Sequence, residues 1–389
     1  MQANRGRTHK SLNEIRYRCL DLFAGCGGLS LGLSWAGTAQ RRIHTIAAID
    51  SWDAACRTYN LNSGLSPKNT GVTTKSVSEA LTRSGDVELV VGGPPCQGFS
   101  TSGRRALDDR RNYLVKNFLD AVKLAEPKAF IFENVSGFIT FQGGLLLREV
   151  TERAQDLGFR VHSAIVLSSR FGVPQRRRRF IMIGVKEGRF QFPGCIDGDQ
   201  TDNPFLDLDQ RTDDSFSPVT FDEATNDLPR LLPGQQFDYY AHDPRSDYQS
   251  WARANSDTVL DHLAPRHSPR LVKLMSYIPQ GASALDPDVS KRIPPSLRPT
   301  SGFPNSYARI RASQPSPTIT RNFTTPSSAN CIHPRQNRAL SLREGARCQS
   351  FPDSFQFHGT HSEKRLQIGN AVPPLLGKAL GDALLESLN

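Results

Sequence analysis

The 389-residue sequence contains seven scattered cysteines but no CxxC pair. An odd number of cysteines without that spacing argues against a disulfide framework and against a zinc site, and it favours a protein of a reducing compartment. No run of eighteen apolar residues occurs, and the basic, polar N-terminus lacks the apolar core of a secretory signal. The GxxxxGK[ST] pattern of a triphosphate-binding P-loop is also absent. We therefore expect a cytoplasmic protein without a metal site or a membrane span.

Positive charge is present in excess, with a formal net charge of +10. Two interpretations stay open on charge alone. The chain is either a basic soluble protein or a partner of a polyanion, because Lys and Arg that neutralise phosphates supply most of the sequence-independent affinity for nucleic acid.

Apolar, strand-like runs alternate with helical spacing through the first 185 residues. This alternation predicts an α/β fold with a doubly wound, mostly parallel sheet. The expected strands are 17–23, 43–50, 87–93, 129–135 and 178–185, and the expected helices are 29–37 and 112–125.

The alternation stops near residue 186. Residues 186–320 hold 16 of the 26 prolines, and 197–214 form an acidic patch. Helical patterns return at 339–351 and at the C-terminus. The predicted division is a flexible tail (1–14), a first part of the catalytic domain (15–185), an inserted loop-rich domain (186–306) and a return to the catalytic domain (307–389).

The stretch "DLFAGCGG" places three glycines, Gly25, Gly27 and Gly28, between an expected strand and an expected helix. Such a turn brings backbone close to a nucleotide-like ligand, and Asp50, at the end of the next strand, could accept hydrogen bonds from ribose hydroxyls. Trp52 offers a flat surface for an adenine ring. The alternative is a plain tight turn with Asp50 as a helix cap.

The stretch "GGPPCQGFS" places Cys96 at the end of another strand, directly after two prolines that fix the backbone. Open α/β sheets have their active sites at these strand ends, and a thiolate is a good nucleophile. An average cysteine is simply a small buried hydrophobe. The Pro-Pro-Cys-Gln-Gly setting favours the nucleophile.

Charged side chains also stand near the ends of two expected strands: Glu133 and the arginine run 176–179. Glu133 ends the apolar strand "AFIFENV", where a carboxylate is either a proton-handling group or an acid at a helix N-terminus. In "VPQRRRRF", alternation along an extended chain puts Gln175, Arg177 and Arg179 on one face. The alternative interpretation is that the four adjacent arginines are simply exposed to solvent or bind phosphate.

Six stretches resemble, in order, those of the cytosine-C5 DNA methyltransferases. They are "DLFAGCGG", "GGPPCQGFS", "FENV", "VPQRRRRF", "SPTIT" and "QIGNAVPP", and they cover 20–185 and about 307–389. The resemblance implies a Rossmann-like class I S-adenosylmethionine-dependent methyltransferase fold, with a target-recognition domain within 186–306. It implies a bacterial or phage enzyme of the restriction-modification type that acts on double-stranded DNA as a monomer, with or without a separate cognate endonuclease.

The resemblance also implies roles for individual residues. S-adenosylmethionine would be held by Phe23, Gly25, Gly27, Leu29, Asp50, Trp52, Pro94, Asn370 and Val372. The catalytic residues would be Cys96 as nucleophile on C6 of a flipped-out cytosine, Glu133 at N3/N4, and Arg179 at O2, supported by Arg177. Substrate contacts would come from Gln97, Ser100, Arg104, Gln175 and Thr318. The C-terminal helix would pack beside the first strand.

Two departures from the family pattern concern the adenine contacts. Ser76 occupies the place of an acid near the third strand, and Asp50 stands where many members have glutamate. Two alternatives remain: an RNA (tRNA) cytosine-C5 methyltransferase, and a catalytically silent DNA-binding protein of the same fold. Intact Cys96 and Glu133 disfavour the silent protein, and 186–306 lacks the Cys-Phe-Thr signature of the tRNA branch.

Within the insert, we expect 264–311 to face DNA and the acidic 197–214 patch to face away from it. The cations in the DNA-facing segment are Arg266, Arg270, Lys273, Lys291, Arg292, Arg298, Arg309 and Arg311.

Overall fold

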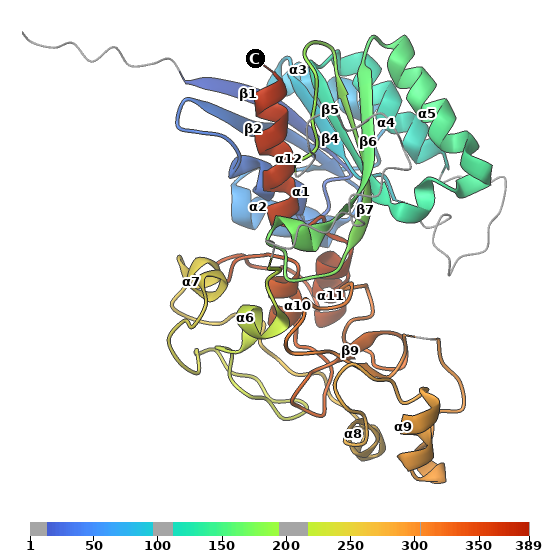
Figure 1. The fold of residues 1–389 in the computed structure, drawn as a ribbon. Coiled ribbons are helices and arrows are strands. Elements are labelled where there is room, and N and C mark those ends of the chain that lie inside the picture. Colours follow the sequence, from blue (N-terminus) through green and yellow to red (C-terminus); the bar gives the residue numbers. More distant parts are fainter. Residues whose placement is uncertain (1–13, 96–111, 194–216, 304, 389) are drawn as a thin grey trace, which may run out of the picture.

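The computed structural model describes residues 14–95, 112–193, 217–303 and 305–388. A seven-stranded sheet forms one lobe (Figure 1), in the order β3-β2-β1-β4-β5-β7-β6. Strand β7 alone runs against the direction of the other six strands, so the predicted doubly wound, mostly parallel sheet is confirmed. The strands are β1 (Ile15–Leu22), β2 (Arg41–Asp50), β3 (Lys68–Asn69), β4 (Leu89–Gly92), β5 (Ala129–Val135), β6 (Arg160–Leu167) and β7 (Arg178–Val185).

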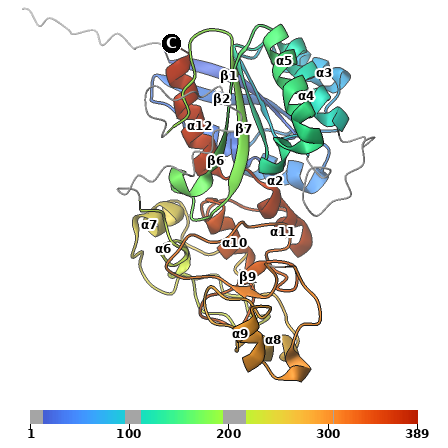
Figure 2. The ribbon, with the colours of Figure 1, turned by 45° about the vertical axis from the view of Figure 1, so that its right-hand side comes forward.

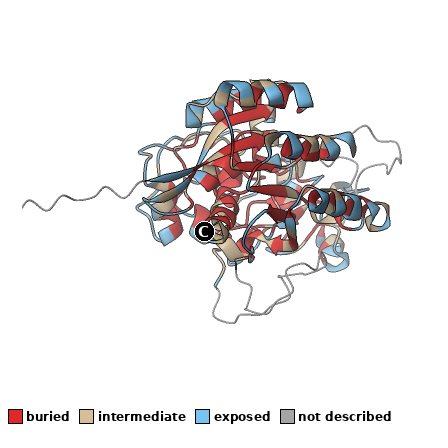
Figure 3. Cartoon of the chain, turned by 90° about the horizontal axis from the view of Figure 1, so that it is seen from above, coloured by how far each residue is buried: buried red, intermediate tan, exposed pale blue. Residues whose placement is uncertain are grey.

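Helices cover both faces of this sheet because its strands are apolar on both sides. In β5, Phe130 and Phe132 pack against α3, α4 and α5, whereas Ala129 and Ile131 face the cluster that contains α1 and α12. Figure 3 shows the buried strands between helices with exposed outer surfaces. The helices of this lobe are α1 (Gly28–Ser34), α2 (Asp53–Ser63), α3 (Thr74–Ser84), α4 (Asn112–Ala125), α5 (Leu145–Asp156) and α12 (Pro374–Ser387), with short 3-10 turns η1 (Ser136–Phe138), η2 (Phe141–Gly144) and η3 (Ser168–Phe171).

The C-terminal helix returns to the first strand region, as expected. α12 packs on α1 at glycines: a Cβ built on Gly32 would lie 2.0 Å from the carbonyl oxygen of Pro374. The hydroxyl of Tyr17 on β1 donates to the carbonyl of Leu388 at 3.1 Å. At the other end of β1, a Cβ built on Gly28 would lie 2.4 Å from the carbonyl oxygen of Val372, so the chain after residue 370 packs directly against the glycine turn that opens α1.

A second lobe of short elements lies below the sheet (Figures 1 and 2). One of its apolar clusters joins Phe221 to Ile310, Phe323 and Phe351, so the segment after residue 307 packs partly with the insert. The division of the chain at 186 and 306 remains a prediction. The elements are α6 (Phe221–Thr225), α7 (Asp247–Arg253), α8 (Pro269–Met275), α9 (Pro287–Arg292), η5 (Pro295–Leu297), β8 (Ala308–Arg309), β9 (Asn330–Ile332), α10 (Leu342–Cys348) and α11 (His361–Asn370).

A buried ion-pair network ties the insert to α10. The guanidinium of Arg347 lies 2.5 Å from Asp227 Oδ1 and 2.6 Å from Asp353 Oδ2, and all three side chains are fully buried. Both carboxylates compensate the charge of the arginine, which alone would be costly to bury. The network holds the segment around Asp227 against α10 within the lower lobe.

Candidate active site

The carboxyl ends of β1, β2, β4 and β5 meet at the lower edge of the sheet, as parallel strands require. Because β7 is antiparallel, its beginning lies at the same edge and brings the arginine run to it. A cleft of about 1470 Å³ opens there between the sheet and the lower lobe. That volume exceeds the ~300–1,000 Å³ of an ordinary small-molecule pocket. It has room for more than one ligand.

The first wall of the cleft is the turn between β1 and α1. Asp50 Oδ2 accepts from the backbone N–H of Gly25 at 2.8 Å, and Oδ1 accepts from the N–H of Trp52 at 2.7 Å. Burial raises the pKa of Asp50, and these backbone donors oppose the shift. The carboxylate therefore holds the glycine turn in place while it lines the cleft together with Phe23, Leu29 and Trp52.

Two features of this wall fit S-adenosylmethionine. Gly25 has φ +54°, and a Cβ built on it would meet nothing within 4 Å, so the turn is open toward the cleft. Gln367, which also lines the cleft, is buried, and its Oε1 has no hydrogen-bond partner in the described part of the chain. An unpaired buried acceptor is costly unless a ligand donor reaches it. Asn370, Val372 and Pro94 complete the lining.

Two residues of this region do not line the cleft. Gly27 has φ +91°, and a Cβ there would come within 2.8 Å of the Tyr59 ring, so this glycine permits packing behind the turn. Ser76 is buried, and its Oγ forms the capping box of α3 with Thr73. The structure thus places Ser76 in a helix cap that does not line the cleft.

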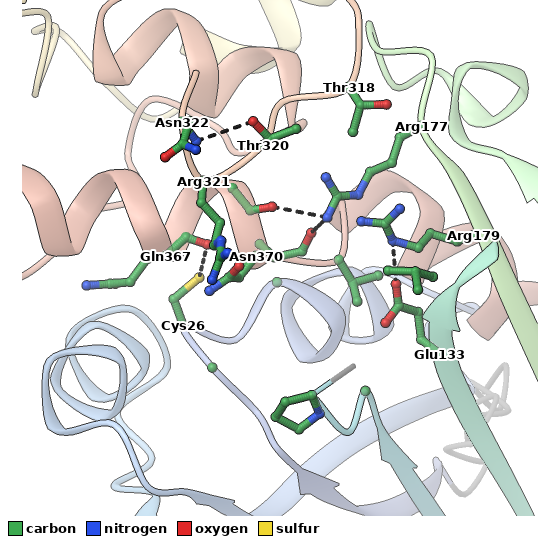
Figure 4. Close-up of a pocket in the computed structure, with 18 of the residues that line it drawn as sticks. Cys26, Glu133, Arg177, Arg179, Thr318, Thr320, Arg321, Asn322, Gln367 and Asn370 are labelled. Atoms are coloured by element: carbon green, nitrogen blue, oxygen red, sulfur yellow. Dashed lines mark hydrogen bonds and ion pairs between the residues drawn. The ribbon is translucent and has the colours of Figure 1, made fainter. Parts of the chain in front are cut away.

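An ion pair forms the second wall. Arg179 Nε lies 2.8 Å from Glu133 Oε1, and each side chain is 13% exposed. Both residues line the cleft, and Figure 4 shows the pair across from the Cys26 side of the glycine turn. The carboxylate that ends β5 is therefore partnered, and it stays accessible to a ligand.

Arg177 and Gln175 are engaged in the protein interior. Arg177 is 2% exposed, and its terminal nitrogens donate to the carbonyls of Ile319 at 2.9 Å and of Gly369 and Ala371 at 3.2 Å. Burial lowers its pKa. Arg177 thus joins the two returning segments as a positioning residue rather than contacting a base.

The placement of Gln175 corrects its expected substrate contact. Gln175 is fully buried. Its amide donates to Gln349 Oε1 at 2.7 Å and accepts from the N–H of Ile319 at 2.7 Å. Because both ends of the amide are occupied and no surface is exposed, this side chain holds the "SPTIT" segment against the sheet lobe.

Thr318 lies at the cleft, as expected, with Oγ1 donating to the carbonyl of Arg176 at 2.8 Å. Four further residues line the cleft that were not among the predicted site residues. Arg321 and Asn322 directly follow the "SPTIT" stretch, Gln367 begins "QIGNAVPP", and Arg176 precedes Arg177. Their position next to or within these stretches was the only sign in the sequence that they belong to the site. Figure 4 shows Arg321 reaching toward Asn370 and Cys26.

Four predicted site residues, Cys96, Gln97, Ser100 and Arg104, lie outside the described residues, as does the acidic 197–214 patch. Their neighbours Pro94 and Pro95 line the cleft. Across the described ranges, no cluster of side chains suits a metal ion, and no helix is long and apolar enough to cross a membrane.

The predicted DNA-facing cations divide into two groups. Arg309 is buried and donates to the carbonyls of Ile278 and His333, each at 2.6 Å, so its expected phosphate contact is wrong. Arg298 is half-buried and donates to the carbonyl of Ile293. The others are exposed, and one of them, Arg311, lines the cleft: Arg266, Arg270, Lys273, Lys291, Arg292 and Arg311.

Comparisons with known proteins agree with this geometry. The model of the C-5 cytosine-specific DNA methylase family matches residues 17–386. The chain is 34% identical to the type II methyltransferase M1.HphI of Haemophilus parahaemolyticus, over 94% of this chain and 86% of that protein. It is 35% identical to the type II methyltransferase M.DdeI of Desulfomicrobium norvegicum, over 95% of this chain and 89% of that protein. The chain belongs to the C-5 cytosine-specific DNA methylase family.

Solved structures show the same fold. A protein of E. coli, described as a DNA modification methyltransferase encoded within a prophage, superposes with a TM-score of 0.71 at 23% identity, over 96% of this chain and 99% of that one. The Dnmt2 methyltransferase of S. pombe superposes with a TM-score of 0.57 at 19% identity, over 96% of this chain and 100% of that one. These likenesses support the fold assignment alone.

Proposed function

We propose that this protein transfers a methyl group from S-adenosylmethionine to C5 of cytosine within a specific double-stranded DNA sequence. The observation that carries the proposal is the Glu133–Arg179 pair, held 2.8 Å apart in a cleft whose other wall is the Asp50-bound glycine turn. One wall suits a pyrimidine edge, which offers acceptors and a protonatable nitrogen. The other suits a nucleoside cofactor.

The cofactor would lie on the glycine-turn wall. Trp52 and Phe23 supply flat surfaces for the adenine, and the Asp50 carboxylate can accept from ribose hydroxyls. The unpaired Oε1 of Gln367 can accept from an ammonium group. When bound, S-adenosylmethionine would supply the electrophilic methyl group for C5 and become S-adenosylhomocysteine.

The catalytic residues would act on the cytosine ring. The Cys96 thiolate adds to C6 and makes C5 nucleophilic. Glu133 holds a proton at N3, and the Arg179 guanidinium donates to O2, so both stabilise the charge that the addition places on the ring. After methylation, a base, for which we propose water, takes the C5 proton, and the electrons of that C–H bond expel Cys96 as thiolate.

The target base must leave the duplex for this chemistry, because C6 is covered in the base stack. The large cleft admits an extruded nucleoside next to the cofactor wall. The type II methyltransferase relatives suggest a restriction-modification setting in the bacterial cytoplasm, with an endonuclease as a separate partner. A monomer is sufficient for the mechanism.

The test is methyl incorporation by the purified protein. Duplex DNA and bulk tRNA are incubated with S-adenosylmethionine carrying a labelled methyl group, and the product nucleosides are separated. The proposal predicts labelled 5-methylcytosine in duplex DNA. Label in tRNA alone would assign the protein to RNA methylation, and label in neither, with cofactor binding retained, would make it a silent DNA-binding protein.

A further inference from the structure

Arg311 is an unengaged cation on the lower wall of the cleft. It lies two residues after the end of β8, its side chain is exposed, and it lines the cleft together with Gly281. In the described part of the chain, no residue forms a hydrogen bond or ion pair with its guanidinium. This distinguishes it from Arg179, which pairs with Glu133, and from Arg309, which is buried.

The backbone that carries Arg311 is fixed on both sides. The N–H of Ile310 donates to the carbonyl of Ile332 at 3.0 Å, and the N–H of Ala312 donates to Gln280 Oε1 at 2.9 Å. Two residues before it, Arg309 anchors the strand by donating to the carbonyls of Ile278 and His333. Hydrogen bonds therefore hold the backbone on both sides of Arg311.

The guanidinium itself rests on a glycine. Gly281 has φ +77°, and a Cβ built on it would lie 2.1 Å from Arg311 Nε and 2.3 Å from Cζ. The N–H of Gly281 donates to the carbonyl of Arg309 at 2.8 Å, so this glycine belongs to the same paired segment. Any side chain at 281 would displace the guanidinium, whereas glycine lets it lie flat against the backbone.

We infer that Arg311 reads a guanine beside the target cytosine, through the O6 and N7 acceptors of that base. The inference rests on the proposed function, because it requires the duplex to enter this cleft. The planar guanidinium, which rests against Gly281, suits two acceptors in one plane, and this is the commonest base-specific contact in protein–DNA complexes. Phosphate contacts need no such fixed plane, and exposed cations such as Lys291 and Arg292 can serve them.

The experiment measures discrimination at each position of the recognition sequence. The sequence methylated by the wild-type protein is placed in a short duplex, and each base pair outside the target cytosine is replaced singly. The value of kcat/KM is then measured on every duplex for the wild type, R311A, R311K and R148A. Arg148 is an exposed residue of α5 that does not line the cleft, so R148A is the matched control.

The inference predicts that R311A lowers kcat/KM on the cognate duplex by about ten- to a hundredfold. At one G·C position, replacing the base pair then causes no further loss, while discrimination elsewhere is retained. R311K gives the same pattern, because an ammonium is a point donor that cannot reproduce the planar fork. R148A behaves as the wild type.

A second variant isolates the role of the glycine. G281A should weaken discrimination at the same G·C position, because its added methyl group displaces Arg311, and it should leave the discrimination pattern of the R311A protein unchanged. A loss of rate that is equal on all duplexes reflects the strain of alanine at φ +77° and is subtracted through the R311A background. A G281A protein that keeps full discrimination at that G·C position would contradict the inference.

Two results would overturn the inference. R311A could weaken all duplexes equally and lower the salt slope of binding by about one, which is the signature of a phosphate contact. Alternatively, R311A could match the wild type on every duplex. A wild-type protein that methylates no duplex would overturn the proposed function itself and, with it, this inference.

Discussion

Arg179 Nε lies 2.8 Å from Glu133 Oε1 across the antiparallel β5–β7 pair, where Val135 faces Arg179 and Glu133 faces Ile181. The antiparallel β7 brings this arginine to the sheet edge where the parallel strands end. The pair keeps a charged carboxylate in a largely buried position, and both groups remain at the cleft surface. A cytosine entering the cleft would meet a carboxylate and a cation side by side.

Glu133→Gln should slow chemistry far more than it weakens DNA binding. The amide keeps an oxygen for Arg179 but cannot carry the proton at N3, so we expect the single-turnover rate to fall by about 10²–10⁴-fold. The dissociation constant for duplex DNA should change by no more than a fewfold. Rapid-quench measurement of methyl transfer, with parallel binding titrations, checks both.

The matched control is Glu149→Gln on α5, where the carboxylate pairs with Lys116 away from the cleft. It should leave rate and affinity unchanged. A Glu133→Gln protein with the wild-type single-turnover rate would remove Glu133 from the proposed chemistry.

Cys96→Ser should abolish methyl transfer and leave cofactor binding intact. A hydroxyl is a much weaker nucleophile than a thiolate at neutral pH, so the addition to C6 should not proceed. Calorimetric titration with S-adenosylhomocysteine should give the wild-type dissociation constant, because the predicted cofactor wall does not include this side chain. Retained transfer in this variant is the result that contradicts the assignment of the nucleophile.

Charge reversal on α9 tests the DNA face. Lys291→Glu with Arg292→Glu should reduce affinity at low salt and lower the slope of log K against log salt by about two, if each cation neutralises one phosphate. Arg83→Glu with Lys123→Glu makes the same change in net charge on α3 and α4 and serves as the control. If the control double variant weakened DNA binding as much as the α9 double variant, the loss would follow from net charge alone, and α9 would not be part of the DNA-binding face.

Asp21 makes the stability of the fold depend on pH. It is 1% exposed and accepts from Ser30 Oγ at 2.5 Å, and burial raises its pKa from 3.8 to about 7. A raised pKa means that the folded state favours the protonated form. Its contribution to stability is therefore complete below pH 3.8 and is lost progressively as the pH rises to about 7.

Asp21→Asn removes this titration. The free energy of unfolding of the variant, relative to wild type, should rise by ~2.7 kcal/mol between pH 5 and pH 8, because about two pH units separate pH 5 from the raised pKa and each unit corresponds to about 1.36 kcal/mol. Urea unfolding at the two pH values measures the difference. A difference that does not change with pH would show that Asp21 is ionised throughout this range in the folded protein.

The strongest local patterns predicted the sheet lobe closely. The apolar strands 129–135 and 178–185 and the helix 112–125 coincide with β5, β7 and α4. The strand β6 was missed because its alternation is broken by His162 and Ser163, which are both buried. The helix expected over 339–351 is shorter, since Ser341 and Glu344 form a capping box that starts α10 at Leu342.

The site was predicted where residues stand at strand ends, as Asp50 and Glu133 do. The sequence could not separate arginines that look alike. All three of Arg177, Arg309 and Arg311 line the cleft. Arg177 and Arg309 donate to interior carbonyls, whereas Arg311 has no hydrogen-bond partner among the residues that the structure describes. That difference depends on which backbone carbonyls converge around each guanidinium, and tertiary packing of distant segments decides it.

The most direct test of the central claim is a map of cytosine methylation in living cells. The chain and its Cys96→Ser variant are expressed in a bacterial strain without cytosine methylases of its own, and the genomes are sequenced after bisulfite treatment. The account predicts protected cytosines in one short sequence context with the wild-type chain and none with the variant. Unprotected cytosines throughout, with soluble protein that binds S-adenosylmethionine, would contradict it.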